Sequence, residues 1–255
     1  MIIKNAIKNQ SYKINFNIDL KKYLNNLIKK YYKVAIITDE NVYKIYKEKI
    51  NIKGLDILRV KPGEKSKSFN VKNSLDEKLL EKKFNRNSLI IGFGGGVVGD
   101  LSGYVAATIL RGIDLVHIPT SLIAIVDSSI GGKTGINSKN GKNLIGSFYN
   151  PREILINSEF IKTLSLKEIR QGLSEIIKYG VIKNEKIFNF LEKSNKVFMQ
   201  NHKKNIDKII KECIKIKIDT VEKDFKENDL RSILNFGHTI CLLYTSDAAD
   251  DEERV

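Results

Sequence analysis

Three glycines, Gly94, Gly96 and Gly99, follow an apolar run and form the pattern G-x-G-x-x-G within "IIGFGGGVVGD". A strand that enters a glycine turn and is followed by a helix exposes backbone N–H groups at the N-terminus of that helix. These donors and the helix dipole favour a phosphate, so the pattern predicts a site for the diphosphate of a dinucleotide. The alternative is a tight turn that binds nothing, because glycine often serves only to let the chain turn.

A carboxylate that binds the ribose of such a nucleotide is expected at the end of a strand. Asp114 lies downstream of the glycines, but it opens a predicted strand instead of ending one. Asp39 is better placed, because it ends the predicted strand "VAIITD" and is followed by Glu40 and Asn41. Ligands bind outside the carboxyl ends of the strands in open α/β sheets. We therefore expect Asp39 to face the nucleotide, in a chain order that differs from the usual nucleotide-binding unit.

The segment of residues 119–151 is too apolar for a linker and too rich in glycine for a helix. It places Lys133 and Lys142 on glycine-flanked loops, with Asp127 and Asn143 close by in the sequence. Lysines on such loops bind phosphate as point charges. The segment therefore predicts a site for a phosphorylated ligand, and the alternative is an ordinary surface turn.

Polar side chains also share one face of two predicted helices. Gln171, Glu175 and Lys178 are spaced i, i+4, i+7 and so lie on one face. A carboxylate and an amine placed in this way ordinarily form a solvated pair. Lys217 interrupts an otherwise apolar or small stripe on a later helix. It either extends its ammonium group to solvent or points into a site that holds an anion.

Arg231, Asn235 and His238 repeat the same i, i+4, i+7 spacing. A lone histidine on a helix is more often a satisfied polar residue than a metal ligand. Here the arginine and asparagine on the same face, and the preceding "NFG", favour the ligand interpretation. Neutral imidazole together with carboxylate suits zinc or cobalt.

Short β-rich runs alternate with helical patterns in the first half of the chain. Near-continuous apolar strands that alternate with helices indicate a parallel sheet covered on both faces. The predicted strands are Lys33–Asp39, Leu55–Val60, Ser88–Gly94 and Asp114–Pro119, and the predicted helices are Val71–Phe84 and Gly99–Leu110. Only helices are predicted in the second half, at Leu164–Ile182 and Asn205–Asp224.

These patterns predict three regions. Residues 1–157 are expected to form an α/β nucleotide-binding domain with a mostly parallel sheet. Residues 158–240 are expected to form a second, all-α domain. Residues 241–255, "CLLYTSDAADDEERV", become acidic in a chain that is basic elsewhere, which predicts a disordered or non-native tail.

The composition bounds the classes of partner. The chain of 255 residues has a formal net charge of +14, and its lysines are scattered from end to end. A nucleic-acid surface would concentrate them on one side, so we expect a small phosphorylated substrate and no nucleic acid. No apolar run approaches the ~20 residues that span a bilayer, and the N-terminus lacks the apolar region of a signal peptide. With only two cysteines, the sequence predicts a cytoplasmic protein with no membrane partner.

Six motifs, taken together, resemble those of one enzyme family, the 3-dehydroquinate synthases. They are "PGEKSK", "GFGGGVVGDLSGYVAAT", "RGIDLVHIPTSLIAIVDSSIGGKTGIN", "GKNLIGSFYNP", "GLSEIIKYG" and "LRSILNFGHT". They occur in the family's order and spacing from about Asp39 to Ile240. This resemblance covers most of the chain and is far more specific than a glycine motif alone.

The resemblance implies a dehydroquinate synthase-like fold and a lyase of the shikimate pathway of aromatic amino acid biosynthesis. It also implies that the all-α domain at residues 158–240 is incomplete and binds metal and substrate. The family converts 3-deoxy-arabino-heptulosonate 7-phosphate into 3-dehydroquinate and phosphate. The substrate is transiently oxidised by NAD, phosphate is eliminated, the ketone is reduced again, and an aldol reaction closes the ring. A divalent metal, usually zinc or cobalt, takes part, and the full-length protein is expected to be a homodimer.

The matched positions imply roles for residues of this chain. Cofactor contacts are implied for Asp39 and Asn41 near the adenosine ribose, for Glu64 and Lys67 in a second loop, for Gly95, Gly96, Val97 and Asp100 in the diphosphate loop, and for Thr120, Ser121, Lys133, Lys142, Phe160 and Thr163. Catalytic or substrate contacts are implied for Arg111, Asp127, Lys133, Asn143, Lys178, Lys217, Arg231 and Asn235. The metal ligands implied are Glu175 and His238, two of the family's three.

The sequence departs from the family pattern at two places. Leu242 stands where the family has a further histidine, and the motif with the third metal ligand does not follow. Because a catalytic zinc normally has three protein ligands, we expect a truncated coding sequence and little or no synthase activity from this chain. Pro62 precedes "GE" where relatives often carry Asp, which weakens the cofactor assignment of that loop.

Other functions remain open at this point. Another sugar-phosphate cyclase or a metal-dependent polyol dehydrogenase would share the fold, although Lys133, Lys142 and Lys178 together favour a phosphorylated substrate over a simple alcohol. A basic nucleic-acid-binding module would show steeply salt-dependent binding, but it leaves the glycine loops without a role.

Overall fold

The structure is a computed structural model that describes residues 2–4, 11–193, 203–225 and 230–236. One sheet has seven strands in the order β1-β2-β9-β6-β5-β3-β4. Its strands are β1 (Ile2–Lys4), β2 (Ser11–Phe16), β3 (Val34–Asp39), β4 (Leu55–Val60), β5 (Leu89–Gly94), β6 (Asp114–Pro119) and β9 (Glu153–Ile156). Neighbouring strands are parallel except for β1 with β2, so the predicted, mostly parallel sheet is confirmed.

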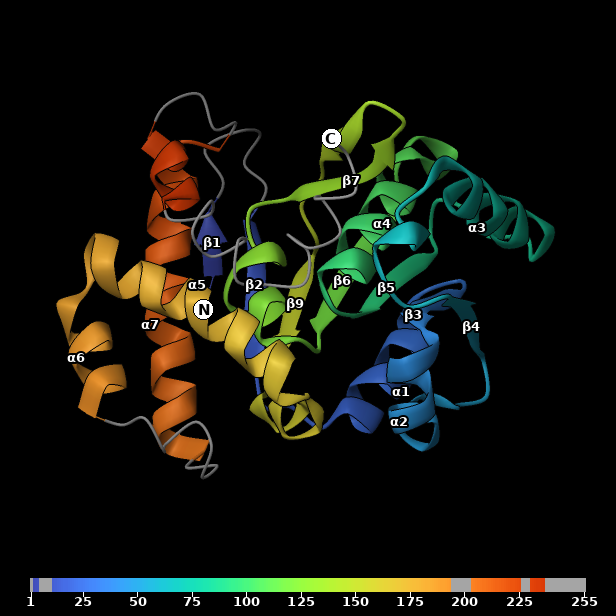
Figure 1. The fold of residues 1–255 in the computed structure, drawn as a ribbon. Coiled ribbons are helices and arrows are strands. Elements are labelled where there is room, and N and C mark those ends of the chain that lie inside the picture. The colour runs from blue at the N-terminus through green and yellow to red at the C-terminus, as the bar shows by residue number, and fades with distance from the viewer. Residues whose placement is uncertain (1, 5–10, 194–202, 226–229, 237–255) are drawn as a thin grey trace.

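Helices cover both faces of this sheet (Figure 1). Alternate strand residues point to opposite faces, so Ile90 of β5 packs with one pair of helices, α3 (Phe69–Glu81) and α4 (Gly96–Thr108). Its neighbour Ile91 packs with the other pair, α1 (Leu20–Lys30) and α2 (Glu40–Ile50). The continuous apolar strands of the sequence are therefore explained by burial on both faces.

The second half of the described chain is helical. It contains α5 (Leu166–Lys183), α6 (Glu185–Lys193), α7 (Lys203–Lys223) and the 3-10 turns η4 (Ser158–Thr163) and η5 (Leu230–Asn235). Tyr12 and Ile14 of β2 share one core with Ile176 of α5 and Ile210 of α7. The helices therefore pack on the β2–β9 side of the sheet, at the left of Figure 1.

The glycine-rich segment that follows β6 is more ordered than the sequence predicted. It contains a π-helical turn, η3 (Ala124–Ser128), and an antiparallel hairpin of β7 (Lys133–Ser138) and β8 (Gly141–Phe148). A Cβ atom at Gly146 would lie 2.1 Å from the backbone oxygen of Thr134. The hairpin therefore requires glycine at this position, because the two backbones approach too closely for a side chain.

Other boundaries differ modestly from the predictions. β3, β4, β5 and β6 lie where strands were expected, to within one residue. The helix α4 begins at Gly96, before the predicted start at Gly99, because the glycine turn is itself the first helical turn. The turns η1 (Glu64–Ser66) and η2 (Ile109–Arg111) complete the α/β part, and the predicted tail at 241–255 lies outside the described residues.

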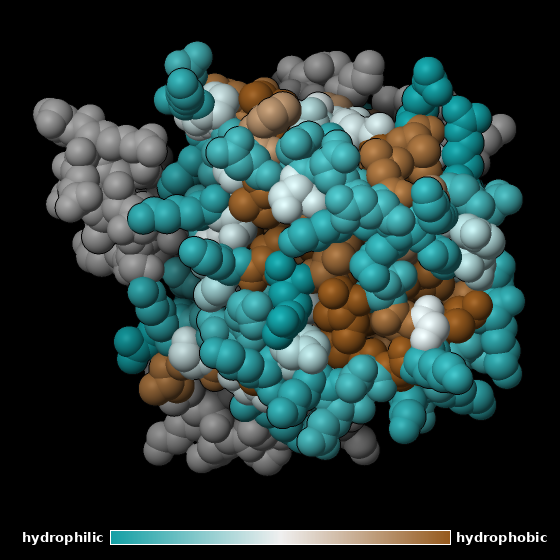
Figure 2. Space-filling view, turned by 90° about the vertical axis from the view of Figure 1, so that its right-hand side faces the viewer, coloured by the Kyte–Doolittle hydropathy of each residue, from teal (hydrophilic) through white to brown (hydrophobic). Residues whose placement is uncertain are grey.

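One face of the α/β part is mainly hydrophilic. Figure 2 shows that hydrophilic residues cover most of the face at the right of Figure 1, around a smaller apolar area. Within the residues that the structure describes, no helix combines the length and hydropathy needed to cross a membrane.

Candidate functional site

A cavity of about 480 Å³ lies where the segments that follow β5 and β6 meet the hairpin and the C-terminal helices. Its charged walls come from both halves of the described chain. Three cationic residues, Lys133, Lys217 and Arg231, line it together with two carboxylates, Asp100 and Asp127. This cavity therefore combines residues that lie far apart in the sequence and carries an excess of positive charge.

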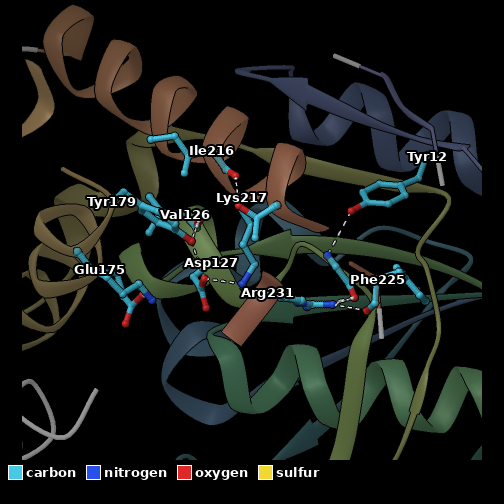
Figure 3. Close-up of polar contacts among 12 residues, drawn as sticks. Tyr12, Val126, Asp127, Glu175, Tyr179, Ile216, Lys217, Phe225 and Arg231 are labelled. Carbon is cyan, nitrogen blue, oxygen red and sulfur yellow. Dashed lines mark hydrogen bonds and ion pairs between the residues drawn. The ribbon is translucent and has the colours of Figure 1, made fainter. Parts of the chain in front are cut away.

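Asp127, on η3, is held by two donors from different helices (Figure 3). Lys217 Nζ on α7 lies 2.7 Å from its Oδ1, and the Tyr179 hydroxyl on α5 donates to the same oxygen at 2.6 Å. Burial opposes the charge, but Lys217, and after it Lys178, outweigh that effect and hold the pKa of Asp127 well below its usual range. Asp127 is therefore a carboxylate at neutral pH.

The structure decides between the two interpretations of Lys217, whose ammonium group could extend to solvent or point into a site. Its side chain is buried, with 7% exposed, and pairs with Asp127. It therefore does not extend to solvent, and it points into a site as the second interpretation predicted.

Lys133, at the start of β7, is a cavity lysine whose pKa is lowered. Burial, and after it the charges of Arg231 and Lys217, lower its pKa to about 8. An anion that entered the cavity would relieve the repulsion among these three cations. The cavity therefore favours a phosphorylated or carboxylated ligand.

Arg231, on η5, is almost completely buried, with 1% exposed. It donates to the backbone oxygen of Phe225 at 2.6 Å and to that of Gly131 at 3.4 Å. The N–H of Gly131 in turn donates to the Tyr12 hydroxyl at 3.2 Å (Figure 3). Gly131 has a φ of +101°, so this network holds the turn that delivers Lys133 to the cavity.

A second buried cation, Lys67, joins three segments on the other side of the cavity. Its Nζ lies 2.7 Å from Asp100 on α4 and also donates to the side chain of Asn143 on β8. Glu64 lies 3.7 Å from the same Nζ and accepts a hydrogen bond from Asn137 at 2.8 Å. Burial raises the pKa of Asp100, and Lys67 opposes this shift.

The glycine turn lies at the carboxyl end of β5 and opens α4. Gly95 is the N-cap residue and makes no side-chain cap, so the first N–H groups of α4 receive no side-chain acceptor from it. Thr120 donates its N–H to the Gly94 oxygen at 2.9 Å, which fixes the turn against the end of β6. Backbone donors without a capping side chain, at the positive end of a helix, fit the diphosphate of a dinucleotide.

Glu175 and Lys178 of α5 are both largely buried and form an ion pair with each other. The solvated pair expected from their spacing alone is therefore wrong, because α5 turns this face inward. Within the described part of the chain, no three His, Cys, Asp or Glu side chains come together as a metal site. His238, the other predicted ligand, lies outside the described residues.

Similarity to known proteins identifies the family of this chain. Two family models match, 3-dehydroquinate synthase N-terminal over residues 57–171 and 3-dehydroquinate synthase C-terminal over residues 172–243. The 3-dehydroquinate synthase of Caldanaerobacter subterraneus subsp. tengcongensis is 43% identical, with 92% of this chain and 68% of the relative covered. The chain belongs to the 3-dehydroquinate synthase family.

The 3-dehydroquinate synthase of Dictyoglomus thermophilum is 47% identical, with 91% of this chain and 66% of the relative covered. The chain thus spans about two thirds of the length of such relatives, with values of 66% and 63% for the two from Dictyoglomus. The predicted family resemblance is therefore confirmed.

Solved structures confirm the fold of the family. A 2-deoxy-scyllo-inosose synthase complexed with carbaglucose-6-phosphate, NAD+ and Co2+ superposes with a TM-score of 0.82 at 25% identity, covering 94% of this chain and 68% of that one. ValA, a 2-epi-5-epi-valiolone synthase from Streptomyces hygroscopicus subsp. jinggangensis with NAD+ and Zn2+ bound, has a TM-score of 0.83 at 24% identity, covering 92% and 68%.

The structure brings most of the implied catalytic residues to one cavity. The cavity wall includes Asp100, Asp127, Lys133, Asn143, Lys217, Arg231 and Asn235. Lys67 pairs with the cavity residue Asp100, and Glu64 pairs with Lys67. The turn at the start of α4 is formed by Gly95, Gly96 and Val97. Lys178 contributes to the charge balance of Asp127 from α5.

Other implied residues lie away from the cavity wall. Asp39 ends β3 and caps α2 by accepting from the N–H groups of Asn41 and Val42. Phe160 is a core side chain that packs against Tyr46 and Phe93, and Thr163 lies 2.8 Å from the Tyr46 hydroxyl.

Four more implied residues differ in their position relative to the glycine turn and the cavity. Thr120 and Ser121 lie beside the glycine turn, whereas Lys142 is exposed on β8 and outside the cavity wall. Arg111 is exposed at the end of η2, which precedes the first residue of β6. It therefore lies toward the amino end of that strand, whereas the glycine turn and Asp127 follow carboxyl ends.

Sequence reasoning missed Tyr179 and the Arg231 network. Tyr179 lies four residues after Glu175, so its place on the inward face of α5 was available from helical periodicity. The contact of Arg231 with the Gly131 turn joins residues one hundred positions apart and had no local signal.

Proposed function

We propose that this chain carries the substrate and cofactor site of a 3-dehydroquinate synthase of the shikimate pathway, an enzyme that converts 3-deoxy-arabino-heptulosonate 7-phosphate into 3-dehydroquinate and phosphate. The observation that carries the proposal is the meeting of Lys133, Lys217 and Arg231 with the Asp127 carboxylate in one cavity. The identity of 47% to a curated relative of that name supports the choice of substrate.

The residues of the cavity divide the work by charge. Lys133 and Lys217 bind the phosphate and carboxylate of the substrate, because opposite charges attract at the cavity wall. Asp127 stays ionised, and its Oδ2 accepts a hydrogen bond from a substrate hydroxyl. Its Oδ1 already accepts hydrogen bonds from Tyr179 and Lys217. Arg231 positions the Gly131 turn and with it Lys133.

NAD is the proposed cofactor, and it supplies a reversible acceptor for the hydride of the substrate. The uncapped N-terminus of α4 holds its diphosphate, and the Lys67–Asp100 pair fixes the first turn of that helix. Asp39 at the end of β3 is proposed to face the ribose. Cofactor and substrate would thus share the carboxyl edge of the sheet.

The described residues do not by themselves form a complete metal site. Glu175 offers a carboxylate, but it pairs with Lys178 in the structure. No step of the proposed reaction is therefore assigned to a metal. Zinc or cobalt, the homodimer, the cytoplasmic location, the absence of a nucleic-acid partner and the domain boundaries at 157 and 240 stay predictions.

Calorimetry and a phosphate assay test the proposal. The purified chain is titrated with NAD and with 3-deoxy-arabino-heptulosonate 7-phosphate, and we expect saturable binding of both. Lys217→Met should weaken substrate binding at least tenfold, because one of three cavity cations is lost. Lys139→Met, on the exposed connection between β7 and β8 and outside the cavity wall, is the control and should bind normally. Absence of substrate binding, or equal loss in both variants, would refute the proposal.

Turnover is measured separately with added zinc or cobalt. Release of phosphate without net NADH identifies a cyclase, whereas accumulation of NADH identifies a polyol dehydrogenase. Because Leu242 replaces a family histidine, we expect little or no turnover from this chain even where both ligands bind. A normal rate would show that the replacement at Leu242 does not prevent turnover and would overturn that expectation.

A related sugar-phosphate cyclase is the second candidate. It is favoured by the TM-score of 0.82 to a 2-deoxy-scyllo-inosose synthase, whose identity of 25% is well below the 47% of the Dictyoglomus relative. Chromatography of the product from either substrate would separate the two activities.

A further inference from the structure

Ser128, the last residue of η3, has a hydroxyl that the described fold leaves unused. Its Oγ is buried and has no hydrogen-bond partner among the residues that the structure describes. Its neighbour Ser129 shares this property. A buried hydroxyl without a partner lowers stability relative to a methyl group in the same place, so such a group invites a ligand-based explanation.

The Ser128 hydroxyl lies directly beside the glycine turn. A Cβ atom built at Gly96, the first residue of α4, would lie 3.1 Å from Ser128 Oγ. This approach places the hydroxyl next to the positive end of α4, where the first backbone N–H groups have no capping side chain from Gly95. A hydroxyl there adds a side-chain donor to the backbone donors of the turn.

Ser128 also stands between two spaces of very different size. It lines the cavity of about 480 Å³ that contains Asp127, and it lines a chamber of about 10 Å³ below the glycine turn. Ser129 lines only the small chamber, together with His117 and the glycines. That chamber holds roughly one water molecule at most, so of the two serines Ser128 is the one that also borders a space large enough for an organic ligand.

We propose that the Ser128 hydroxyl donates a hydrogen bond to the diphosphate of the bound dinucleotide, at the phosphate nearer the cavity. The inference rests on the proposed function, because it takes NAD as the ligand of the glycine turn. A donor to a charged phosphate oxygen makes a stronger hydrogen bond than a donor to a neutral group. Ser128 thus contacts the cofactor where it extends from the glycine turn into the cavity that contains Asp127.

Ser128→Ala and the matched control Ser129→Ala test this role. Binding of NAD and of ADP-ribose, which share the diphosphate, is measured by calorimetry, and the melting temperature is measured without ligand. We expect Ser128→Ala to weaken both ligands about tenfold, the loss of one charge-assisted hydrogen bond. Ser129→Ala should bind both as the unchanged chain does. Neither variant should have a lower melting temperature than the unchanged chain, because each substitution removes a hydroxyl that has no partner among the described residues.

Each other outcome overturns the proposal in a distinguishable way. If the unchanged chain binds neither ligand, the proposed function fails and this inference with it. If the unchanged chain binds and Ser128→Ala binds equally well, only the role of Ser128 is wrong. A loss with NAD alone would place the contact on the nicotinamide instead of the diphosphate. A melting temperature of Ser128→Ala well below that of the unchanged chain would show that the hydroxyl supports the fold itself, and the proposed role in binding would be wrong.

Discussion

Lys217 of α7 donates to Asp127 Oδ1 at 2.7 Å, and this contact joins the helical half of the chain to the segment that follows β6. Both side chains belong to the cavity wall. The pair therefore serves the packing of the two halves and the charge of the candidate site at once.

Removing the carboxylate from this pair should destabilise the fold. Asp127→Ala leaves Lys217 with 7% of its side chain exposed and no carboxylate partner, and we expect the free energy of unfolding to fall by about 3 kcal/mol. Lys215→Ala breaks the exposed pair with Glu212 on the same helix and should change it by less than ~0.5 kcal/mol. Urea denaturation measures both, and equal effects would contradict the buried-pair interpretation.

His117, on β6, should give the stability a distinct pH dependence. Burial lowers its pKa from 6.5 to about 4, so the folded state resists a proton that the unfolded chain accepts. The unfolding free energy should therefore fall by about 3 kcal/mol as the pH falls from above 6.5 to about 4, and this contribution should be constant below. Denaturant curves between pH 4 and pH 8 would show this loss in the unchanged chain but not in His117→Gln. Parallel curves for the two proteins would be incompatible with a buried neutral imidazole.

Lys67 is expected to fix both α4 and the hairpin. Lys67→Met leaves Asp100 without the cation at 2.7 Å and should lower the unfolding free energy by about 2–4 kcal/mol. Amides of β8 should exchange faster with solvent, because the Asn143 contact is also lost. Lys65→Met, an exposed position in the same short turn, is the control for both measurements. Unchanged exchange in β8 would show that the hairpin is held by other contacts.

Lys133 should be unusually reactive toward acylating reagents. Because the pKa of Lys133 is about 8, half of its amine groups are neutral at a pH of about 8. A lysine of ordinary pKa near 10.4 is neutral in well under ~1% of molecules at the same pH. Mass spectrometry after brief labelling should find Lys133 modified at least tenfold faster than Lys139 on the connection between β7 and β8. Added phosphorylated substrate should suppress this reaction, because an anion favours the charged ammonium. Slow labelling of Lys133 would show that its environment does not favour the neutral amine.

The elements of the α/β half were largely predictable. The strands from β3 to β6 are apolar runs bounded by charges or turn residues, and burial on both faces explains their composition. β9 escaped prediction because it has only four residues, and β2 because its sequence SYKINF is not a continuous apolar run. The parallel pairing between Ile14 and Ile154 is set by packing across most of the chain. The hairpin escaped because its exposed β8 lacks an apolar face, and its pairing depends on the close approach at Gly146.

By itself the sequence determined the family, the glycine turn after β5 and the residue types available for phosphate, because these depend on local order and spacing. The tertiary structure decided which of those residues meet. Lys217, buried on Asp127, and Glu175, paired with Lys178, could not be distinguished from surface charges by periodicity. Whether a charge is buried depends on what packs over its helix face, and that is settled by segments distant in the chain.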